Sequence, residues 1–282
     1  MSPVTLAAVA APFGRDLDRA LADVEALLDR ARLAGADLVV LPEAALGGYL
    51  HDLNGGRPGA PPDLPPVLDV DGPVVRRVAE LADDLVVCVG LCEGDGDLRY
   101  NTAACVHAGE VLGVHRKVHL PLREDASYAC GSGFAAFDTP VGRLGMLICY
   151  DKAFPEAGRS LALDGAEVIA CLSAWPCSRT DPAPTLAEDR WTQRFDLLDR
   201  AGALHDQVVW VSANQSGTFG DLRFVASAKV VGPGGEVLAT TGTEPGLAVA
   251  TLDVGEALAG TRRYMGHLRD RRPDTYGAAV SV

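Results

Sequence analysis

The run Gly145-Met146-Leu147-Ile148-Cys149-Tyr150-Asp151 ends an apolar segment on a cysteine, and Phe154-Pro155-Glu156 follows shortly after. The apolar segment predicts a buried strand, and the residues after it predict a helix. Cys149 would then lie at a strand-to-helix elbow, where a nucleophile leaves the sheet and a helix N-terminus can lower the pKa of the thiol. Taken alone, a cysteine in an apolar run is more often a buried structural residue.

Two further segments favour a catalytic interpretation of Cys149. Val39-Val40-Leu41-Pro42-Glu43 is an apolar run that ends in a carboxylate, and Val114-His115-Arg116-Lys117 places a lysine at the end of another strand-like run. Either segment alone predicts only a solvated surface charge. In the order Glu43, Lys117, Cys149, however, the three motifs resemble the nitrilase superfamily of carbon–nitrogen hydrolases.

The resemblance extends over nearly the whole chain, from residues 4–10 to residues 270–273. It implies an α/β fold, the α-β-β-α sandwich, in which two sheets lie face to face with helices outside. Because no linker or composition break divides the chain, we expect a single domain over 1–282. The predicted strands are 4–10, 37–41, 85–91, 100–106, 110–115, the strand ending at 148, 167–172, 207–212, 226–231 and 236–239, and the predicted helices are 16–34, 73–82, 154–164 and 184–206, with a loop at 55–66.

Hydrolysis of an amide by a thiol needs a thiolate, a proton carrier for the leaving amine and a positive or dipolar cradle for the oxyanion. Cys149 is the expected nucleophile, and Glu43 the general base that takes the thiol proton, delivers it to departing ammonia and then activates water. Lys117 would stabilise the thiolate and the oxyanion. The resemblance implies the backbone N–H of Tyr150 as a second oxyanion donor. Lys152, by contrast, is expected to be an ordinary surface lysine.

A second glutamate precedes an aromatic segment ending in glycine in members of the superfamily, and the run from Arg123 to Gly131 matches that pattern. By this match Glu124 would hold Lys117 and position the substrate nitrogen. Its neighbour Asp125 competes for the same assignment. A solvated carboxylate in a surface loop is the ordinary alternative for Glu124.

Two histidines, His115 and His119, flank Lys117 and raise the alternative of a cysteine–histidine protease. The sequence around Cys149 lacks the local signature of those proteases, which argues against it. The chain has no glycine-rich nucleotide-binding motif, so no cofactor is expected.

The residues after the cysteine favour an amide substrate. Nitrilases proper usually have Trp-Glu there, whereas amide and carbamoyl hydrolases of the superfamily more often have Tyr-Asp followed by Phe-Pro-Glu, as this chain does. We therefore expect hydrolysis of a small-molecule amide, with a nitrile or an N-carbamoyl amine as the alternatives. The candidate substrate-binding residues are Tyr49, Tyr128, Tyr150 and Trp175.

Other interpretations stay open at several positions. Trp175 could equally be a core or interface residue, and Trp191 and Phe195 are expected in the core. Arg179 could anchor a substrate carboxylate or be an ordinary exposed arginine. A different class of function is a binding or assembly protein of the same fold whose site has decayed. The intact set of three motif residues argues against decay.

Composition bounds the partners and the compartment. A net charge of −13 disfavours nucleic acid, which needs an excess of Lys and Arg. No apolar run approaches the ~20 residues that span a bilayer, and Met1-Ser2-Pro3 lacks the basic start of a secretory signal. Seven cysteines, an odd number without disulfide-scaffold density, favour the reducing cytoplasm. Cys88 and Cys92 lack a second pair at zinc-ligand spacing, so core packing is favoured and no metal is expected.

The resemblance also implies assembly, because members of the superfamily pair through helices near the nucleophile. The helix at 154–164 and the tail at 262–282, which mixes apolar and basic residues, are the expected contacts of a homodimer or a larger even homo-oligomer. A docked or frayed terminus on a monomer is the alternative.

Overall fold

A computed structural model describes residues 3–52 and 63–276, which alternate strands and helices as the sequence predicts. The strands are β1 Val4–Ala11, β2 Leu38–Val40, β3 Val86–Asp95, β4 Leu98–His107, β5 Glu110–Arg116, β6 Phe137–Thr139, β7 Gly142–Ile148, β8 Val168–Ser173, β9 Val209–Gln215, β10 Thr218–Phe219, β11 Leu222–Arg223, β12 Lys229–Val231, β13 Val237–Thr240 and β14 Gly246–Leu252. The helices are α1 Leu17–Leu33, α2 Pro73–Ala82, α3 Pro155–Leu163, α4 Arg190–Asp206 and α5 Val254–Arg262, with 3-10 turns η1 Glu124–Ala126, η2 Cys149–Ala153 and η3 Pro273–Thr275. Most of the predicted loop 55–66 lies outside the described residues.

One continuous hydrogen-bonded path, β5-β4-β3-β2-β1-β9-β8-β7-β6, runs through the described strands. Strands β12 and β14 join it by pairing with β9 and β1, and β13 pairs with β12. Along this path, the link between the two halves is the pairing of β1 with β9, at Ala10–Asn214 and Ala11–Gln215. The two expected sheets are therefore joined at one edge by this short contact.

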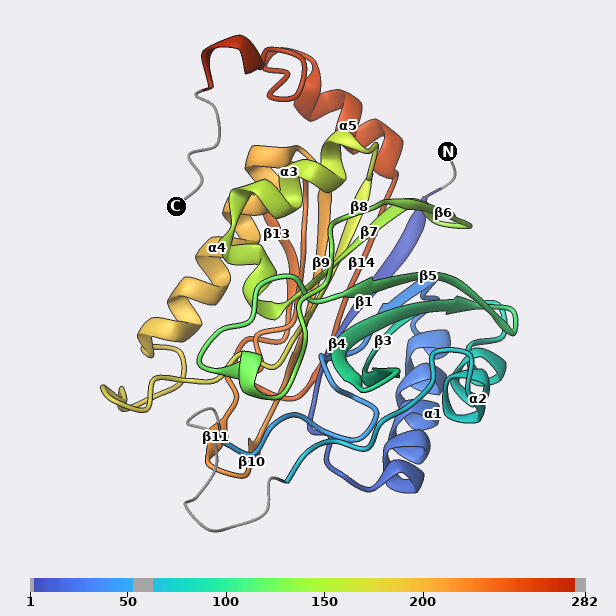
Figure 1. The fold of residues 1–282 in the computed structure, drawn as a ribbon. Coiled ribbons are helices and arrows are strands. Elements are labelled where there is room, and N and C mark those ends of the chain that lie inside the picture. The colour runs from blue at the N-terminus through green and yellow to red at the C-terminus, as the bar shows by residue number, and fades with distance from the viewer. Residues whose placement is uncertain (1–2, 53–62, 277–282) are drawn as a thin grey trace.

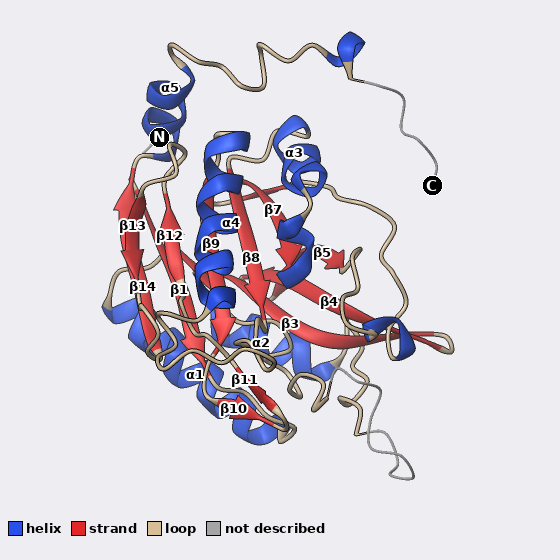
Figure 2. Ribbon diagram, turned by 90° about the vertical axis from the view of Figure 1, so that its left-hand side faces the viewer, coloured by secondary structure: helices blue, strands red, loops and turns tan. Residues whose placement is uncertain are grey.

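The halves fold face to face and helices cover both outer faces (Figure 1). On β8, Val168 and Ala170 belong to the central core between the sheets, whereas Ile169 packs outward with α3 and α4. On β1, Ala7 faces outward in the same way, toward α1 and α2. Figure 2 shows the strands between the two pairs of helices. The predicted α-β-β-α sandwich is confirmed.

The active-site candidates come together because their strands run in one direction. Strands β2, β1, β9, β8 and β7 follow one another in the path and run parallel to one another. Parallel strands have their carboxyl ends at the same edge, where α/β folds place their ligands. The segments after β2, β7 and β8 carry Glu43, Cys149 and Trp175, which therefore lie at this edge although they are far apart in the sequence.

Two predicted elements start later than expected. Helix α4 begins at Arg190 and not at 184, because the carboxylate of Asp189 caps it by accepting the backbone N–H of Trp191 at 2.9 Å. Strand β12 begins at Lys229 and not at 226, because Ala226 and Ser227 have φ values of +57° and +54°, which no strand can accommodate.

Strand β14 and helix α5 were not expected from the sequence. Strand β14 pairs with β1 along its whole length, from Val4–Leu252 to Ala10–Gly246. Helix α5 follows it directly. Asp253 is the N-cap of this helix, and its side chain accepts the backbone N–H of Glu256 at 2.9 Å. The Asp-x-x-Glu spacing at 253–256 could have predicted this helix.

Candidate active site

Cys149 follows β7 directly and begins η2, so the predicted strand-to-helix elbow is confirmed. Its φ of +49° lies in the left-handed region, which residues with a Cβ rarely adopt. Its side chain is buried. Backbone strain of this kind is found mostly at functional sites, where the surrounding structure holds it in place.

Glu43 lies three residues beyond β2 and is fully buried, with three hydrogen bonds to its carboxylate. Oε1 accepts Asn101 Nδ2 at 2.7 Å and Lys117 Nζ at 2.8 Å, and Oε2 accepts the backbone N–H of Ala174 at 2.6 Å. Gln215 Nε2 donates to the backbone carbonyl of Glu43 at 2.9 Å. These contacts hold Glu43 from four strands or strand ends, three through its carboxylate and one through its backbone carbonyl. Sequence reasoning missed Asn101 and Gln215, which lie in ordinary strand-like runs.

Lys117 follows β5, and its ammonium lies between two carboxylates. Nζ is 2.8 Å from Glu43 Oε1, 3.0 Å from Glu124 Oε1 and 2.8 Å from Glu124 Oε2, and all three side chains are fully buried. Its backbone N–H donates to the carbonyl of Asn101 at 2.8 Å. A buried ammonium needs such pairing, because an isolated charge inside a protein is costly.

Glu124 belongs to this cluster and Asp125 does not. Glu124 is buried in η1 and also accepts the hydroxyl of Tyr49, whereas Asp125 is exposed. Arg123, just before the turn, has a φ of +66°, which directs the chain so that Glu124 faces inward. Of the two acidic residues that the sequence left open, Glu124 is therefore the one that contacts Lys117.

Burial and charge set the protonation of the cluster. Burial raises the pKa of the Cys149 thiol well above its ordinary value, Glu43 raises it further, and Lys117 opposes the rise without reversing it. The expected lowering by the helix N-terminus is therefore wrong for this resting state. Burial also raises the pKa of Glu124, to about 7, against the effect of Lys117. Burial opposes the charge of Lys117, but Glu124 and Glu43 outweigh it and raise its pKa.

A cavity of about 150 Å³ opens onto Cys149. Three of the four expected substrate-binding residues, Tyr49, Tyr150 and Trp175, line it. Tyr128 does not line it and is buried in a small apolar cluster beside it. The other lining residues are Pro121, Leu122, Ala174, Pro176 and Trp191. Trp191 was expected in the core, and its place in the lining could not be read from helical periodicity.

Trp175 is held from both sides. Its backbone N–H donates to Asn214 Oδ1 at 2.8 Å, and its indole N–H donates to the backbone carbonyl of Trp191 at 3.1 Å. The rings of Trp175 and Trp191 lie 5.8 Å apart, centroid to centroid. Arg179 lies outside the lining, with Nη1 3.7 Å from Asp52 Oδ1.

A family model described as carbon-nitrogen hydrolase matches residues 5–260. The chain belongs to this family. It is therefore a hydrolase of carbon–nitrogen bonds, as the order of the three motifs predicts. A nitrilase from Pyrococcus abyssi is 32% identical to it over 84% of either chain. An N-carbamoylputrescine amidase from Solanum tuberosum is 30% identical over 99% of this chain and 95% of its own.

A solved structure supports the same assignment. A variant of the amidase from Nesterenkonia sp. AN1, with the acetamide moiety of fluoroacetamide bound covalently to its active-site cysteine, is 25% identical. It covers 96% of this chain and 94% of its own, with a TM-score of 0.75. The amidase-like branch of the superfamily is therefore supported by sequence and by structure.

Asp151 connects the two loops that carry Lys117 and Cys149 in this hydrolase. Its Oδ2 accepts the backbone N–H of Ile148 at 3.1 Å and His115 Nε2 at 3.0 Å, and its Oδ1 accepts both the backbone N–H and Nδ1 of His119 at 2.9 Å. Burial opposes the charge of Asp151, but the hydrogen bonds from His115 and His119 hold its pKa well below its ordinary value. The two histidines thus bind this carboxylate, which gives the cysteine–histidine alternative no support.

All three lysines of the hydrolase, Lys117, Lys152 and Lys229, are buried. Lys152 Nζ and Lys229 Nζ each lie 2.7 Å from an oxygen of Asp199, and Lys152 Nζ is also 5.5 Å from the centroid of the Trp175 ring. The expectation that Lys152 is a surface lysine is therefore wrong. Its carboxylate partner comes from α4, which the sequence does not place beside η2.

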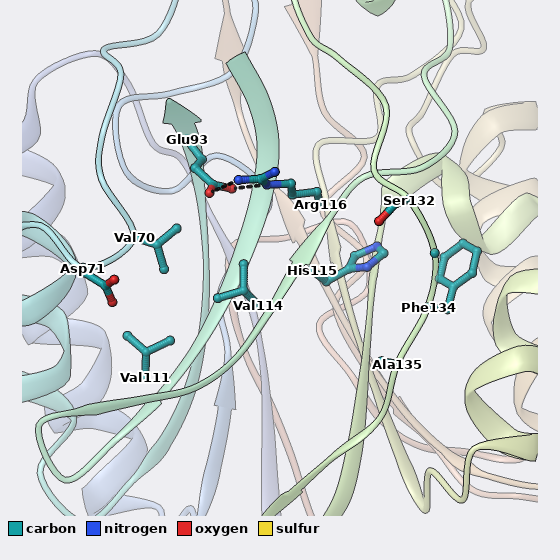
Figure 3. A pocket seen from close by; sticks show the side chains of 11 residues that line it. Val70, Asp71, Glu93, Val111, Val114, His115, Arg116, Ser132, Phe134 and Ala135 are labelled. Atoms are coloured by element: carbon teal, nitrogen blue, oxygen red, sulfur yellow. Dashed lines mark hydrogen bonds and ion pairs between the residues drawn. The ribbon is translucent and has the colours of Figure 1, made fainter. Parts of the chain in front are cut away.

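A second, larger cavity of about 730 Å³ lies beside β5 and the segment 132–135 (Figure 3). Figure 3 shows the ion pair of Glu93 and Arg116 in its wall, with His115 near Phe134. Neither Cys149 nor any of the clustered residues Glu43, Lys117 and Glu124 lines this cavity. The larger volume of this cavity therefore does not mark it as the catalytic site. His115 lies in its wall and contacts Asp151, which connects the cavity to the loop that carries Cys149.

The described residues offer neither a metal centre nor a membrane-spanning helix. No group of three or more His, Cys, Asp or Glu side chains in that part of the chain is arranged to hold a metal ion. No helix there is long and apolar enough to cross a membrane. Cys88 and Cys92 are both buried among apolar side chains, in agreement with core packing.

Proposed function

We propose that this hydrolase cleaves small-molecule primary amides to a carboxylic acid and ammonia, through a thioester on Cys149. The observation that carries the proposal is the cavity that opens onto Cys149 beside the buried set Glu43, Lys117 and Glu124. Such a set offers a nucleophile, a base and a fixed positive charge, which are the groups that amide cleavage by a thiol requires.

The first half of the reaction forms the thioester. The raised pKa of Cys149 keeps its thiol protonated at rest. Glu43 therefore takes this proton as the sulfur attacks the amide carbon. Lys117 and the backbone N–H of Tyr150 stabilise the oxyanion. Glu43 then passes the proton to the amide nitrogen, the C–N bond breaks and ammonia leaves.

The second half regenerates the enzyme. Glu43 takes a proton from a water molecule, which attacks the thioester carbon, and the C–S bond breaks as the sulfur recovers a proton. Glu124 holds the ammonium of Lys117 and positions the substrate nitrogen, which its distances of 3.0 and 2.8 Å to Lys117 Nζ support. The covalent adduct on the active-site cysteine of the Nesterenkonia amidase supports a thiol adduct here as well.

The test is ammonia release by the purified chain from butyramide, with N-carbamoylputrescine and butyronitrile as the competing substrates. We expect release from butyramide by the wild type, none above background by Cys149→Ala, and normal release by Cys130→Ala, which removes an exposed thiol. A quenched reaction should show one butyryl group on the peptide that contains Cys149. Wild-type turnover by Cys149→Ala would refute the mechanism, and exclusive turnover of the nitrile or the carbamoyl amine would assign that alternative.

We further propose that the hydrolase forms a homodimer or a larger even assembly. In support, Leu163 of α3, Leu204 of α4, and Tyr264 and Met265 of the tail are exposed apolar side chains. The tail lies beside α4, where His267 Nδ1 is 3.0 Å from the carbonyl oxygen of Leu204. The tail docks on its own chain first, because Gln207 Nε2 donates to the carbonyl of Met265 at 2.6 Å. Of the tail at 262–282, residues 277–282 lie outside the described part.

Light scattering at micromolar concentration tests the assembly, with an expected mass of twice 29.5 kDa or a larger even multiple. A fully active monomer would contradict it. We also propose that the chain forms a single domain, which the lack of a linker or composition break in its sequence supports. The seven cysteines, an odd number without disulfide-scaffold density, support a location in the reducing cytoplasm. The net charge of the chain is −13. The same charge supports a chain without a nucleic-acid partner.

A further inference from the structure

We infer that the site accepts only uncharged acyl groups of about six non-hydrogen atoms or fewer, and that Trp191 sets this limit. The inference rests on the proposed function and deepens it. Its basis is the cavity beside Cys149, which is lined by aromatic, proline and small apolar residues, together with the charges that lie behind that lining.

The volume of the cavity limits the size of the acyl group. At about 150 Å³ it is well below the roughly 300–1,000 Å³ of pockets for drug-sized ligands. An apolar cavity of about this volume accommodates a molecule of the size of benzene. An acyl group of about six non-hydrogen atoms therefore fills the cavity. A longer acyl chain or an aromatic acyl group would clash with the lining residues.

Charges behind the lining disfavour a cationic acyl group. No residue that lines the cavity is charged. Aromatic rings can attract a cation, but the ammonium of Lys152 already lies 5.5 Å from the centroid of Trp175 and 3.1 Å from that of Phe195. Lys229 lies 4.1 Å from Phe195, and the two lysines share the carboxylate of Asp199. A substrate ammonium placed against Trp175 would therefore compete with the ammonium of Lys152 for the same ring.

An anionic acyl group is disfavoured for a different reason. The nearest cation on the catalytic side is Lys117, which already lies between the carboxylates of Glu43 and Glu124. A substrate carboxylate would enter an apolar cavity without a partner, next to two groups of the same sign. Burying an unpaired charge costs several kcal/mol, far more than a buried methyl group contributes.

Trp191 forms the part of the wall that can be removed without loss of the backbone structure. Its backbone N–H is held by the carboxylate of Asp189 at 2.9 Å, and its carbonyl accepts the indole N–H of Trp175 at 3.1 Å. Both contacts use the backbone of Trp191, so a smaller side chain keeps them. The indole itself lies partly exposed against the cavity.

Matched substrates test the charge rule in the wild-type chain. Butyramide and 3-aminopropanamide have the same shape, with a methyl group in one and an ammonium in the other. In the second pair, 3-methylbutanamide and malonamate, a carboxylate replaces an isopropyl group. We expect kcat/KM for ammonia release to be at least about 100-fold higher for the neutral member of each pair. Equal values within either pair would overturn the inference and leave amide hydrolysis itself standing.

Trp191→Ala tests the size rule. The ratio of kcat/KM for phenylacetamide to that for butyramide should rise at least about tenfold in Trp191→Ala and stay near the wild-type value in Trp191→Phe. Leu197→Ala, on the exposed face of the same helix, is the control and should leave the ratio unchanged. An unchanged ratio in a folded Trp191→Ala would remove Trp191 from the specificity. Failure of the wild type to release ammonia from any amide would instead refute the proposed function.

Discussion

Lys117 Nζ and Glu43 Oε1 lie 2.8 Å apart, with both side chains fully buried and Glu124 on the other side of the ammonium. If Lys117 stabilises the oxyanion, Lys117→Met should lower kcat for butyramide by about 10²–10³-fold, as the loss of one oxyanion donor does in other enzymes.

Lys229→Met is the matched control, because Lys229 is equally buried and paired with a carboxylate but lies outside the catalytic cluster. It should lower stability and leave kcat within a few-fold of the wild type. Circular dichroism and urea unfolding of both variants separate the two effects. Equal losses of kcat in both would assign Lys117 a structural role only.

The raised pKa of Glu124, about 7 against an ordinary 4.5, predicts a pH-dependent stability. Below pH 4.5 the carboxyl is neutral in both the folded and the unfolded chain. As pH rises from 4.5 to 7 the unfolded chain loses this proton first, so the stability that Glu124 contributes declines and is lost above pH 7. Glu124→Gln stays neutral throughout. Relative to the wild type, it should therefore gain up to ~3 kcal/mol of unfolding free energy between pH 4.5 and pH 8.

Urea unfolding of wild type and Glu124→Gln at the two pH values measures this difference. Asp125→Asn, which changes the exposed neighbour, is the control and should show no comparable pH effect. A constant difference between wild type and Glu124→Gln across this range would contradict the raised pKa.

The raised pKa of Cys149 predicts slow alkylation near neutral pH. The rate of reaction with iodoacetamide should still be rising at pH 9, because the thiolate is the reactive form and burial keeps the thiol protonated. Peptide mapping by mass spectrometry follows Cys149 and the exposed Cys130 in the same sample. A plateau for Cys149 near pH 7 would show a preformed thiolate and would make Glu43 unnecessary as the first base.

Gly90 on β3 predicts a backbone requirement beside the carboxylate of Glu43. A Cβ at this position would lie 2.4 Å from the backbone nitrogen of Ala44 and 2.9 Å from the Cα of Glu43. Gly90→Ala should therefore displace Glu43, lower kcat at least about tenfold and cost ~1–3 kcal/mol of stability. Gly133→Ala is the control, since a Cβ there meets nothing within 4 Å. Normal kcat in Gly90→Ala would contradict the expected displacement.

The fold and the central residues could be predicted from the sequence because both depend on local patterns. Apolar runs that end in Glu43, Lys117 and Cys149 mark strand ends, and their order matches one superfamily. The start of α4 was predicted too early, since a cap formed by Asp189 decides it and periodicity does not register a cap. The strand predicted at 226–231 was too long for a similar reason. The positive φ values of Ala226 and Ser227 prevent a strand there, and an apolar pattern does not indicate them.

The supporting contacts could not be predicted, because they join residues that are distant in the sequence. Asn101 reaches Glu43 across 58 positions and Asp199 reaches Lys152 across 47. Lys152 shows the consequence most clearly. The sequence around Cys149 gives no sign that this lysine is buried, because its partner Asp199 lies far away in the sequence, on α4. The direction of the Cys149 pKa shift also depends on this enclosure, which a local view of the helix N-terminus does not include.

The protonated state of Lys117 has a chemical consequence for the proposed thioester. A neutral amine beside a thioester would capture the acyl group from sulfur and form a stable amide, which would inactivate the enzyme irreversibly. Glu43 and Glu124 raise the pKa of Lys117 and so keep its nitrogen without a free lone pair. The other two lysines are buried against Asp199. The same carboxylates that position Lys117 for the reaction therefore protect the protein from acylating itself.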